Sequence, residues 1–417
     1  MGLFVLRCQK FQLNSEELAV HTSHTYMAKA GGFEMRRISM GRRPFFFFLL
    51  FSVVMGVQGC SGTQAFQGGE RGIASSAIHL NESKALPATA KIRRPKSPIR
   101  GIYVSSSAVR SPKMEKLIEL VDRTELNAMV IDVNGGINLI ELPPSSPRPS
   151  NSRSAKHFRQ TVKRLKSKDI YLIARIVTFK NPSLARAMPA WTLKKKDGTV
   201  WRDRGGEAWI DPYRQEAWGY PISLAQEALR IGFDEVQFDY VRFPENRDKV
   251  DREVNFHNPN GWSRPEAIGR FLHKAAGKVH KSGGIISADV FGLIGTARGD
   301  MGIGQRWSTI AAEVDVISPM VYPSHYSPGI WGINAPDLMA GSIVSHAMKD
   351  AVKQNNELRR NGRHIAEVRP WLQSFTASWV HPHQTYGSAQ IREQVRAASK
   401  EGVNGYLLWN ASCRYPN

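Results

Sequence analysis

In the stretch Glu235-Val236-Gln237-Phe238-Asp239-Tyr240-Val241, β-branched and aromatic residues predominate, which predicts a buried β-strand that ends in polar residues. Seven similar runs lie on either side of this stretch, between residue 99 and the end of the chain. They are Arg100–Val104, Ala128–Val133, Tyr171–Val177, Ile285–Val290, Val316–Tyr322, Arg369–Phe375 and Gly405–Asn410. Amphipathic helical patterns separate them at Pro112–Thr124, Ala155–Lys168, Arg214–Arg230, Pro265–Lys281, Ser342–Arg360 and Ser388–Lys400.

Eight strands alternating with helices predict an α/β protein with a parallel sheet closed into a single (β/α)8 TIM barrel. The chain has 417 residues, of which about 320 follow the N-terminal region, and such barrels need roughly 250 residues plus insertions. A doubly wound sheet is the alternative. It is less favoured because no glycine-rich phosphate-binding turn follows the first strand.

One insertion, Leu193–Asp203, predicts a β-hairpin whose turn is Asp197-Gly198. Because it follows the third strand, we expect it above that strand, on the face of the barrel where active sites lie.

The chain carries 57 Lys and Arg against 36 Asp and Glu, a net charge of +21. Such a surplus favours association with polyanions, including acidic glycans, anionic lipids and nucleic acid, although a solvated basic surface explains it equally well. Hydrophobic residues at 41% and charged residues at 22% exclude a disordered or fibrous chain.

The N-terminal region has the order of a secretory signal. Arginines at 36, 37, 42 and 43 precede an apolar run from Pro44 to Val57, which is too short to span a membrane as a helix. Val57-Gln58-Gly59-Cys60 then resembles a bacterial lipobox, with Cys60 as the lipidated first residue of the mature protein. The signal is complete if translation starts at Met35 or Met40.

This order predicts three segments: a signal peptide with an over-long start at 1–59, a lipidated Cys60 and flexible linker at 60–97, and the barrel at 98–417. Ser61 stands where an inner-membrane retention signal would have Asp. We therefore expect a lipoprotein of the bacterial cell envelope, anchored in the outer membrane through Cys60. Cys413 would be the other cysteine of the mature chain, so no intramolecular structural disulfide is expected.

Polar residues end several of the predicted strands, at the position where TIM barrels carry their active sites. Asp239 ends the fourth run and shares a face with Gln237, and Asp289 shares a face with Ser287 on the fifth. A carboxylate at the end of an apolar strand is costly unless it is hydrogen-bonded or used in chemistry. For each aspartate the alternative is a helix cap or a buried salt bridge.

Two carboxyl groups are what glycosidic bond cleavage requires, one to protonate the leaving oxygen and one to attack the anomeric carbon or activate water. We expect Asp239 and Asp289 to be catalytic. Aromatic side chains near the strand ends would stack on sugar rings. The predicted substrate contacts are Tyr103, Asp132, Arg175, Gln237, Arg242, Tyr322, His325, Gln373 and Trp409.

Several motifs together resemble a bacterial family of glycosyl-hydrolase-like barrels, long catalogued as a domain of unknown function and related to the alpha-amylase and alpha-galactosidase group. The motifs are Gly101–Val104, Asp122–Ala128 with Ile131–Val133, Glu235–Pro244, Ser287–Gly292, Ile317–Tyr326 and Gly405–Asn410. The resemblance implies a barrel in which Asp239 is the nucleophile, with retention of configuration. The sequence departs from amylase-type enzymes at Gln237 and Asp289, where those have Arg and Glu.

The predicted function is hydrolysis of O-glycosidic bonds in an envelope or extracellular oligo- or polysaccharide, and the basic charge of the chain allows for an acidic one. The alternative is a non-catalytic carbohydrate-binding barrel with an envelope or adhesion role. Nucleic-acid binding rests on charge alone and lacks a recognition module. No cofactor is predicted, and His381-Pro382-His383 lacks the second ligand cluster that a metal site needs.

Overall fold

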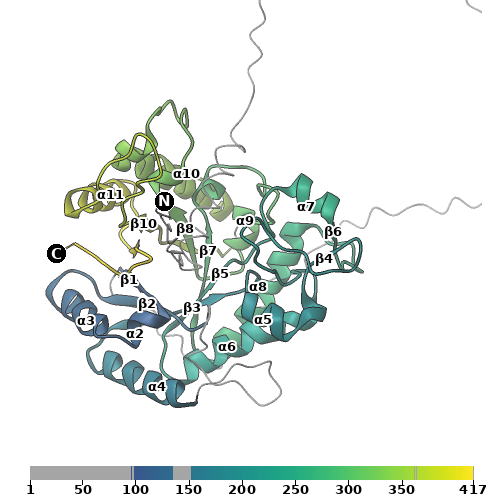
Figure 1. The fold of residues 1–417 in the computed structure, drawn as a ribbon. Coiled ribbons are helices and arrows are strands. Elements are labelled where there is room, and N and C mark those ends of the chain that lie inside the picture. The colour runs from purple at the N-terminus through teal and green to yellow at the C-terminus, as the bar shows by residue number, and fades with distance from the viewer. Residues whose placement is uncertain (1–94, 96–97, 135–151, 361, 363, 417) are drawn as a thin grey trace, which may run out of the picture. The chain divides into compact units, whose positions relative to one another are not determined.

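Eight parallel strands close into a barrel in the structure, a computed structural model that describes residues 95, 98–134, 152–360, 362 and 364–416 (Figure 1). The first and last strands pair with each other, β1 with β11, and this pairing closes the ring. The predicted (β/α)8 barrel is therefore confirmed. In ring order the strands are β1 (Arg100–Val104), β2 (Ala128–Asp132), β3 (Tyr171–Val177), β5 (Glu235–Asp239), β7 (Ile285–Phe291), β8 (Val316–Val321), β10 (Trp371–Gln373) and β11 (Tyr406–Trp409).

Helices surround the strands in the same view (Figure 1). All six predicted helical stretches are present. The helices are α2 (Ser106–Val109), α3 (Lys113–Arg123), α4 (Ser152–Ser167), α5 (Pro182–Ala187), α6 (Gly219–Arg230), α7 (Arg247–Glu253), α8 (Arg264–Lys281), α9 (Trp307–Ile310), α10 (Ala340–Arg359) and α11 (Ser388–Lys400).

Strand β5 shows how the sequence separates the inside of the barrel from its outside. Its alternate residues Val236 and Phe238 are apolar and fully buried, and the Phe238 ring lies 5.4 Å from that of Phe271 on α8. Because side chains alternate across a strand, Glu235, Gln237 and Asp239 share the opposite face, inside the barrel.

Side chains inside such a barrel stack in layers along its axis, and the interior face of β5 supplies one polar group at each of three levels. Glu235 pairs with Arg369 and accepts a hydrogen bond from the Tyr171 hydroxyl at 3.1 Å. Gln237 Nε2 donates to the Ser318 hydroxyl at 3.1 Å. Asp239, at the end of the strand, therefore occupies the level nearest the C-terminal mouth.

Helix α8 illustrates why the surrounding helices form where they do. The Ser263 side chain accepts from the backbone N–H of Glu266, so it caps the first turn, and Pro265 fits that turn because it needs no amide donor. Basic residues occupy the last turn, where they interact favourably with the helix dipole. Phe271 lies on the buried face that packs on the barrel.

The seventh predicted strand is shorter in the structure than predicted, and a separate short strand precedes it. The strand β9 (Glu367–Val368) pairs with the start of β8, and β10 pairs with its end. Between them lies Arg369-Pro370, and proline has no amide hydrogen to donate to a sheet. Of the predicted run at 369–375, Trp371–Gln373 therefore forms a strand, and β9 lies just before the run.

The predicted hairpin is present. Lys194, in β4 (Lys194–Lys195), bridges Val200 in antiparallel fashion, and Gly198 adopts a positive φ of 84° in the turn. A further short strand, β6 (Val254–Asn255), pairs with β4 on its other side. This small sheet fixes the segment that carries Trp201, Asp203 and Trp209.

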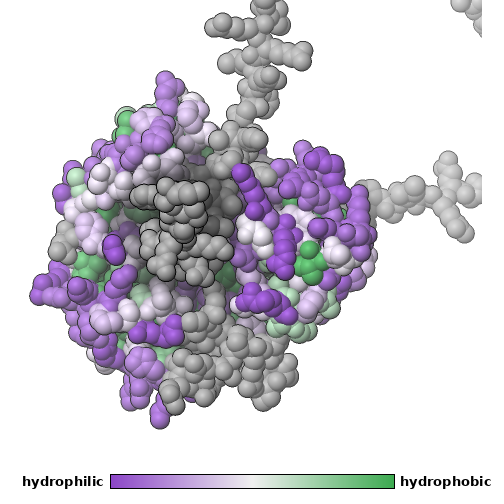
Figure 2. Space-filling view, viewed as in Figure 1, coloured by the Kyte–Doolittle hydropathy of each residue, from purple (hydrophilic) through white to green (hydrophobic). Residues whose placement is uncertain are grey.

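The visible surface of the described residues is mostly hydrophilic (Figure 2). Within the described ranges, no helix is both long and apolar enough to cross a membrane. The predicted signal peptide at 1–59 and Cys60 lie outside the described residues, as does nearly all of the predicted linker at 60–97.

Candidate active site

A pocket opens at the C-terminal ends of the strands, with an empty volume of about 780 Å³ including its open mouth. It is lined by Arg175, Asp239, Tyr240, Arg242, Asp289, Phe291, Gly292, Met320, Tyr322, His325, Trp371, Phe375 and Trp409. Seven of the eleven predicted catalytic and substrate-contacting residues are among them. The other four, Tyr103, Asp132, Gln237 and Gln373, are buried but do not line the pocket.

Arg175 joins two carboxylates inside the barrel. Its Nε and Nη2 donate to Oδ2 of Asp239 at 3.0 and 2.6 Å, and its Nη1 donates to Oδ1 of Asp132. The Tyr103 hydroxyl donates to the other oxygen of Asp132 at 2.5 Å. Asp132 therefore lies behind Arg175 and fixes its orientation, while Asp239 lies in front of it, in the pocket.

Burial and charge act against each other in this cluster. Burial lowers the pKa of Arg175, but the carboxylates of Asp132 and Asp239 outweigh it and hold that pKa well above its ordinary value. Burial is also the main reason why the pKa of Asp132 is raised, against the opposing effects of Arg175 and Tyr103. Arg175 therefore remains a cation at any pH at which the protein is folded.

Among the residues that the structure describes, the donors to the Asp239 carboxylate are all N–H groups. Besides Arg175, the backbone N–H of Tyr240 donates to its Oδ1 at 2.6 Å. Tyr240 adopts a φ of +50°, in the left-handed region that non-glycine residues seldom occupy. Backbone strain of this kind concentrates at functional sites, where the surrounding structure compensates for it.

Asp289 has a different environment on the neighbouring strand β7. It is 1% exposed, and its Oδ1 accepts a hydrogen bond from the indole N–H of Trp371 at 2.7 Å. Burial, and secondly the negative charge of Asp239, raise the pKa of Asp289 well above its ordinary value, although Arg175 and the Trp371 hydrogen bond oppose this. The surroundings of Asp289 therefore favour its protonated form more than those of an exposed aspartate do.

Tyr322 follows β8 and lines the same pocket. Burial and the negative charges of Asp289 and Asp239 raise the pKa of its hydroxyl well above the ordinary value. Its ring meets those of His325 and Phe375 edge to face, with centroids 5.1 and 5.7 Å away. This side of the pocket thus offers an aromatic surface and a neutral hydroxyl.

Trp409 forms another aromatic wall at the end of β11. Its ring centroid lies 4.2 Å from that of Tyr103 and 5.5 Å from that of Trp371. The guanidinium carbon of Arg175 lies 5.1 Å from the Trp409 centroid. Trp409 and Arg175 therefore support each other through a cation–π contact.

Gln237 and Gln373 hold the barrel together beneath the pocket. Gln373 accepts from the backbone N–H and hydroxyl of Ser324 at 3.1 and 2.8 Å, and it donates to Asp337 at 3.1 Å. With these partners in place, Gln373 fixes the loop that carries His325. Gln237 lies one level deeper than Asp239, as its contact with Ser318 shows.

Six lining residues were not among the predicted site residues: Tyr240, Phe291, Gly292, Met320, Trp371 and Phe375. A signal for Trp371 was available, because it is two residues before Gln373 and so shares its face of the strand. Position 292 requires glycine for steric reasons, since a Cβ there would come within 2.6 Å of the Met320 carbonyl oxygen. Such a close approach appears only in three dimensions.

Three solved structures are similar to this one, and the first of them supports the fold. The glycoside hydrolase domain of PgaB (BpsB) from Bordetella bronchiseptica matches with a TM-score of 0.52 and 13% identity, over 76% of this chain and 95% of that domain. A hypothetical protein from Ruminiclostridium thermocellum is 31% identical over 45% of this chain and 97% of its own, with a TM-score of 0.38. The alpha-galactosidase TtGalA from Thermus thermophilus matches at 13% identity and a TM-score of 0.46, over 78% of this chain and 60% of its own.

No curated protein is similar enough in sequence to count as a match. One family model does match, under the description "Putative glycosyl hydrolase domain", and it covers residues 101–415. That range runs from β1 past β11, so it includes every strand of the barrel and every residue that lines the pocket. Because the match spans well over half of the chain, the protein belongs to this glycosyl hydrolase domain family.

Proposed function

We propose that the protein hydrolyses O-glycosidic bonds of an oligo- or polysaccharide in the pocket at the barrel mouth. The observation that carries the proposal is the contrast between two carboxyl groups that line this pocket. Asp239 accepts hydrogen bonds from Arg175 and from a backbone N–H, whereas burial and the charge of Asp239 raise the pKa of Asp289. Neighbouring carboxyl groups with opposite environments are the pattern that divides acid from nucleophile in glycosidases.

In this proposal Asp289 is the proton donor. Its carboxyl proton passes to the glycosidic oxygen as the bond to the anomeric carbon breaks, so the leaving sugar departs as an alcohol. A carboxyl group with an ordinary pKa would already have lost that proton at neutral pH. The buried setting of Asp289 removes this difficulty.

Asp239 is the proposed nucleophile, and the reaction retains the anomeric configuration. Its carboxylate oxygen forms a bond to the anomeric carbon and gives a glycosyl-enzyme. Asp289, now a carboxylate, takes a proton from water as the water oxygen attacks the same carbon and releases Asp239. Arg175 holds the Asp239 carboxylate in place through both cycles of bond making and breaking.

The aromatic residues of the pocket would bind the sugar itself. Trp409 ends β11 and Tyr322 follows β8, and both line the same pocket, so stacking on sugar rings is available from more than one side. Arg242 and His325 supply polar groups at the rim. These contacts support a carbohydrate as the ligand.

The decisive experiment is to screen the purified protein against a glycan panel, with Asp239→Asn beside it. Release of reducing ends by the wild type and its loss in the variant would support the proposal. Asp169→Asn is a matched control, because Asp169 is exposed at a positive φ of 57° that asparagine also tolerates. Proton NMR of the first product would reveal retention. Glycan binding without turnover by the wild type would instead favour a carbohydrate-binding barrel.

We also propose that the protein works in the bacterial cell envelope, attached to the outer membrane through a lipidated Cys60. The support is the order of charged, apolar and small residues before Cys60. An envelope or extracellular polysaccharide is then the substrate within reach.

A further inference from the structure

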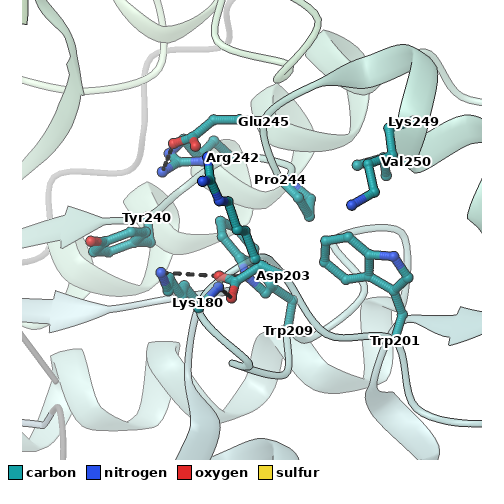
Figure 3. A pocket seen from close by; sticks show the side chains of 12 residues that line it. Lys180, Trp201, Asp203, Trp209, Tyr240, Arg242, Pro244, Glu245, Lys249 and Val250 are labelled. Carbon is teal, nitrogen blue, oxygen red and sulfur yellow. Dashed lines mark hydrogen bonds and ion pairs between the residues drawn. The ribbon is translucent and has the colours of Figure 1, made fainter. Parts of the chain in front are cut away.

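A second pocket adjoins the barrel mouth, with an empty volume of about 530 Å³ including open space (Figure 3). It lies beside the predicted hairpin and is lined on one side by Tyr240 and Arg242. The same two residues line the pocket that contains Asp239 and Asp289. The two pockets therefore share a wall made of Tyr240 and Arg242.

Aromatic rings build the second pocket and are fixed by hydrogen bonds. The indole N–H of Trp201 donates to Glu253 at 2.8 Å, and that of Trp209 donates to Asp203 at 2.9 Å. Figure 3 shows Tyr240 at one end of the pocket and Trp201 at the other. Rings held in this way are preorganised to receive a sugar.

Cationic side chains outnumber carboxylates in the lining. The four cations are Lys180, Arg204, Arg242 and Lys249, and the two carboxylates are Asp203 and Glu245. Lys180 pairs with Asp203 at 3.1 Å and Arg242 pairs with Glu245 at 2.8 Å, as the dashed lines in Figure 3 indicate. Each carboxylate thus already has a cationic partner, and two cations of the lining have no carboxylate of the lining to pair with.

The remaining cations are Arg204 and Lys249. Arg204 is exposed and makes no ion pair with any residue in the described part of the chain. Lys249 has only a long contact with Glu253, at 3.8 Å, between two half-exposed side chains. Exposed pairs of this length contribute little, so Lys249 is available to another anion.

Two cations of the second pocket, Lys180 and Arg242, are positioned by their surroundings. Burial lowers the pKa of Lys180, but Tyr240 and Asp203 outweigh it, and the pKa is raised. Lys180 and Arg242 also lie over the rings of Trp209 and Tyr240, between 5.1 and 5.8 Å from the ring centroids. The wall is therefore a fixed layer of charged and aromatic groups.

We propose that this pocket binds an anionic sugar residue, carrying a carboxylate or a sulfate, of the same glycan whose bond is cleaved at the barrel mouth. Its excess of two cations disfavours a cationic amino sugar, and a neutral sugar would give Arg204 no ion pair and leave Lys249 with its long contact to Glu253. The inference rests on the proposed function, since it takes the bound glycan to be the substrate.

The test measures binding rather than turnover. A glycan array with uronate-containing, sulfated and neutral oligosaccharides is probed with the wild type and with Asp239→Asn, which prevents cleavage during the measurement. We expect both proteins to retain acidic glycans. Carboxyl-reduced or desulfated counterparts should bind at least about tenfold more weakly. Comparison of the uronate and sulfate arms identifies the anion. Binding should also weaken as salt is added.

Substitutions then locate the anion. Arg204→Gln with Lys249→Gln should weaken binding of the best acidic glycan about tenfold, because two ion pairs are lost. The control is Arg202→Gln with Lys196→Gln, which removes the same charge from exposed positions outside the pocket lining and should change binding less than twofold. Circular dichroism confirms that both variants are folded.

The inference and the proposed function can fail separately. If no acidic glycan binds, if neutral counterparts bind as well, or if the pocket variant matches its control, the anionic pocket is refuted, whatever the turnover. If binding depends on charge as expected but Asp239→Asn remains fully active, the catalytic assignment fails and the pocket remains as a binding site.

Discussion

The guanidinium of Arg175 donates to Oδ2 of Asp239 from both Nε, at 3.0 Å, and Nη2, at 2.6 Å. The same cation also holds Asp132 through Nη1. One buried cation thus serves two carboxylates, of which only Asp239 lines the pocket. This sharing decides what substitution of each member should do, because removal of one carboxylate still leaves Arg175 with a partner.

Asp239→Asn should abolish most activity with little effect on folding. The amide cannot attack an anomeric carbon, so turnover should fall by several orders of magnitude. Arg175 would still be paired with Asp132, so the free energy of unfolding should decrease by no more than about 1–2 kcal/mol. Glycan turnover and urea unfolding are measured on the same sample. A stable, fully active variant would remove Asp239 from catalysis, and a decrease of about 3–5 kcal/mol with retained activity would indicate a structural ion pair.

Arg175→Met, unlike Asp239→Asn, should strongly destabilise the folded protein. It leaves Asp132 and Asp239 buried without their cation, and stranding buried charges is expected to destabilise the protein by about 3–5 kcal/mol at neutral pH. The difference in free energy of unfolding from the wild type should become smaller at acidic pH, because the unpaired carboxylates then take up protons. Urea unfolding at several pH values measures this. A variant as stable as the wild type at neutral pH would show that the cluster contributes nothing to folding.

The sequence predicted the barrel because its strands are buried on both faces and so appear as continuous apolar runs. It could not pair Glu235 with Arg369, which meet inside the barrel although 134 residues separate them. Each is a charge at the start of a predicted run, and nothing local identifies its partner. Only closure of the ring brings the two strands' interior faces together.

The candidate site was predicted in part. Asp239 and Asp289 were identified as polar residues at the ends of apolar strands, where a carboxylate is costly unless it is hydrogen-bonded or used in chemistry. The same rule put Asp132 and Gln373 among the substrate contacts, whereas the structure uses both to orient neighbours of the pocket. Alternation along a strand tells which residues face inward. It does not tell which of them reach the mouth and which remain a level below.

Cys60→Ser should release the protein from the membrane. Without the thiol there is no atom to carry the lipid, so the protein should move from the membrane fraction to the soluble one or accumulate with its signal attached. Cys8→Ser is the control, since residue 8 would be removed with the signal and the mature mass should not change. Mass spectrometry of the wild-type membrane fraction should find no peptide upstream of Cys60. An intact soluble chain that keeps residues 1–59 would contradict the lipid anchor.

Asp289→Asn should lower the activity of the protein without lowering its stability at neutral pH, and it should change how both depend on pH. The folded state raises the pKa of Asp289, mainly by burial, whereas the unfolded chain loses this proton near the ordinary value of 3.8. The stabilising contribution of the bound proton is therefore complete below that value and is lost as pH rises through the folded pKa. Asparagine has no proton to lose, and its side-chain oxygen can still accept from Trp371.

The variant should consequently be at least as stable as the wild type at neutral pH, and its stability should depend less on pH. Its turnover of native glycans should fall by roughly 10²–10⁴-fold, since a general acid is missing, and less for aryl glycosides, whose leaving groups need no proton. The wild-type rate should decline at alkaline pH as Asp289 ionises, and this decline should vanish in the variant. Profiles of kcat/KM against pH on both substrate types measure this. An unchanged alkaline decline in Asp289→Asn would assign the proton donor to another residue, with Tyr322 the next one to substitute.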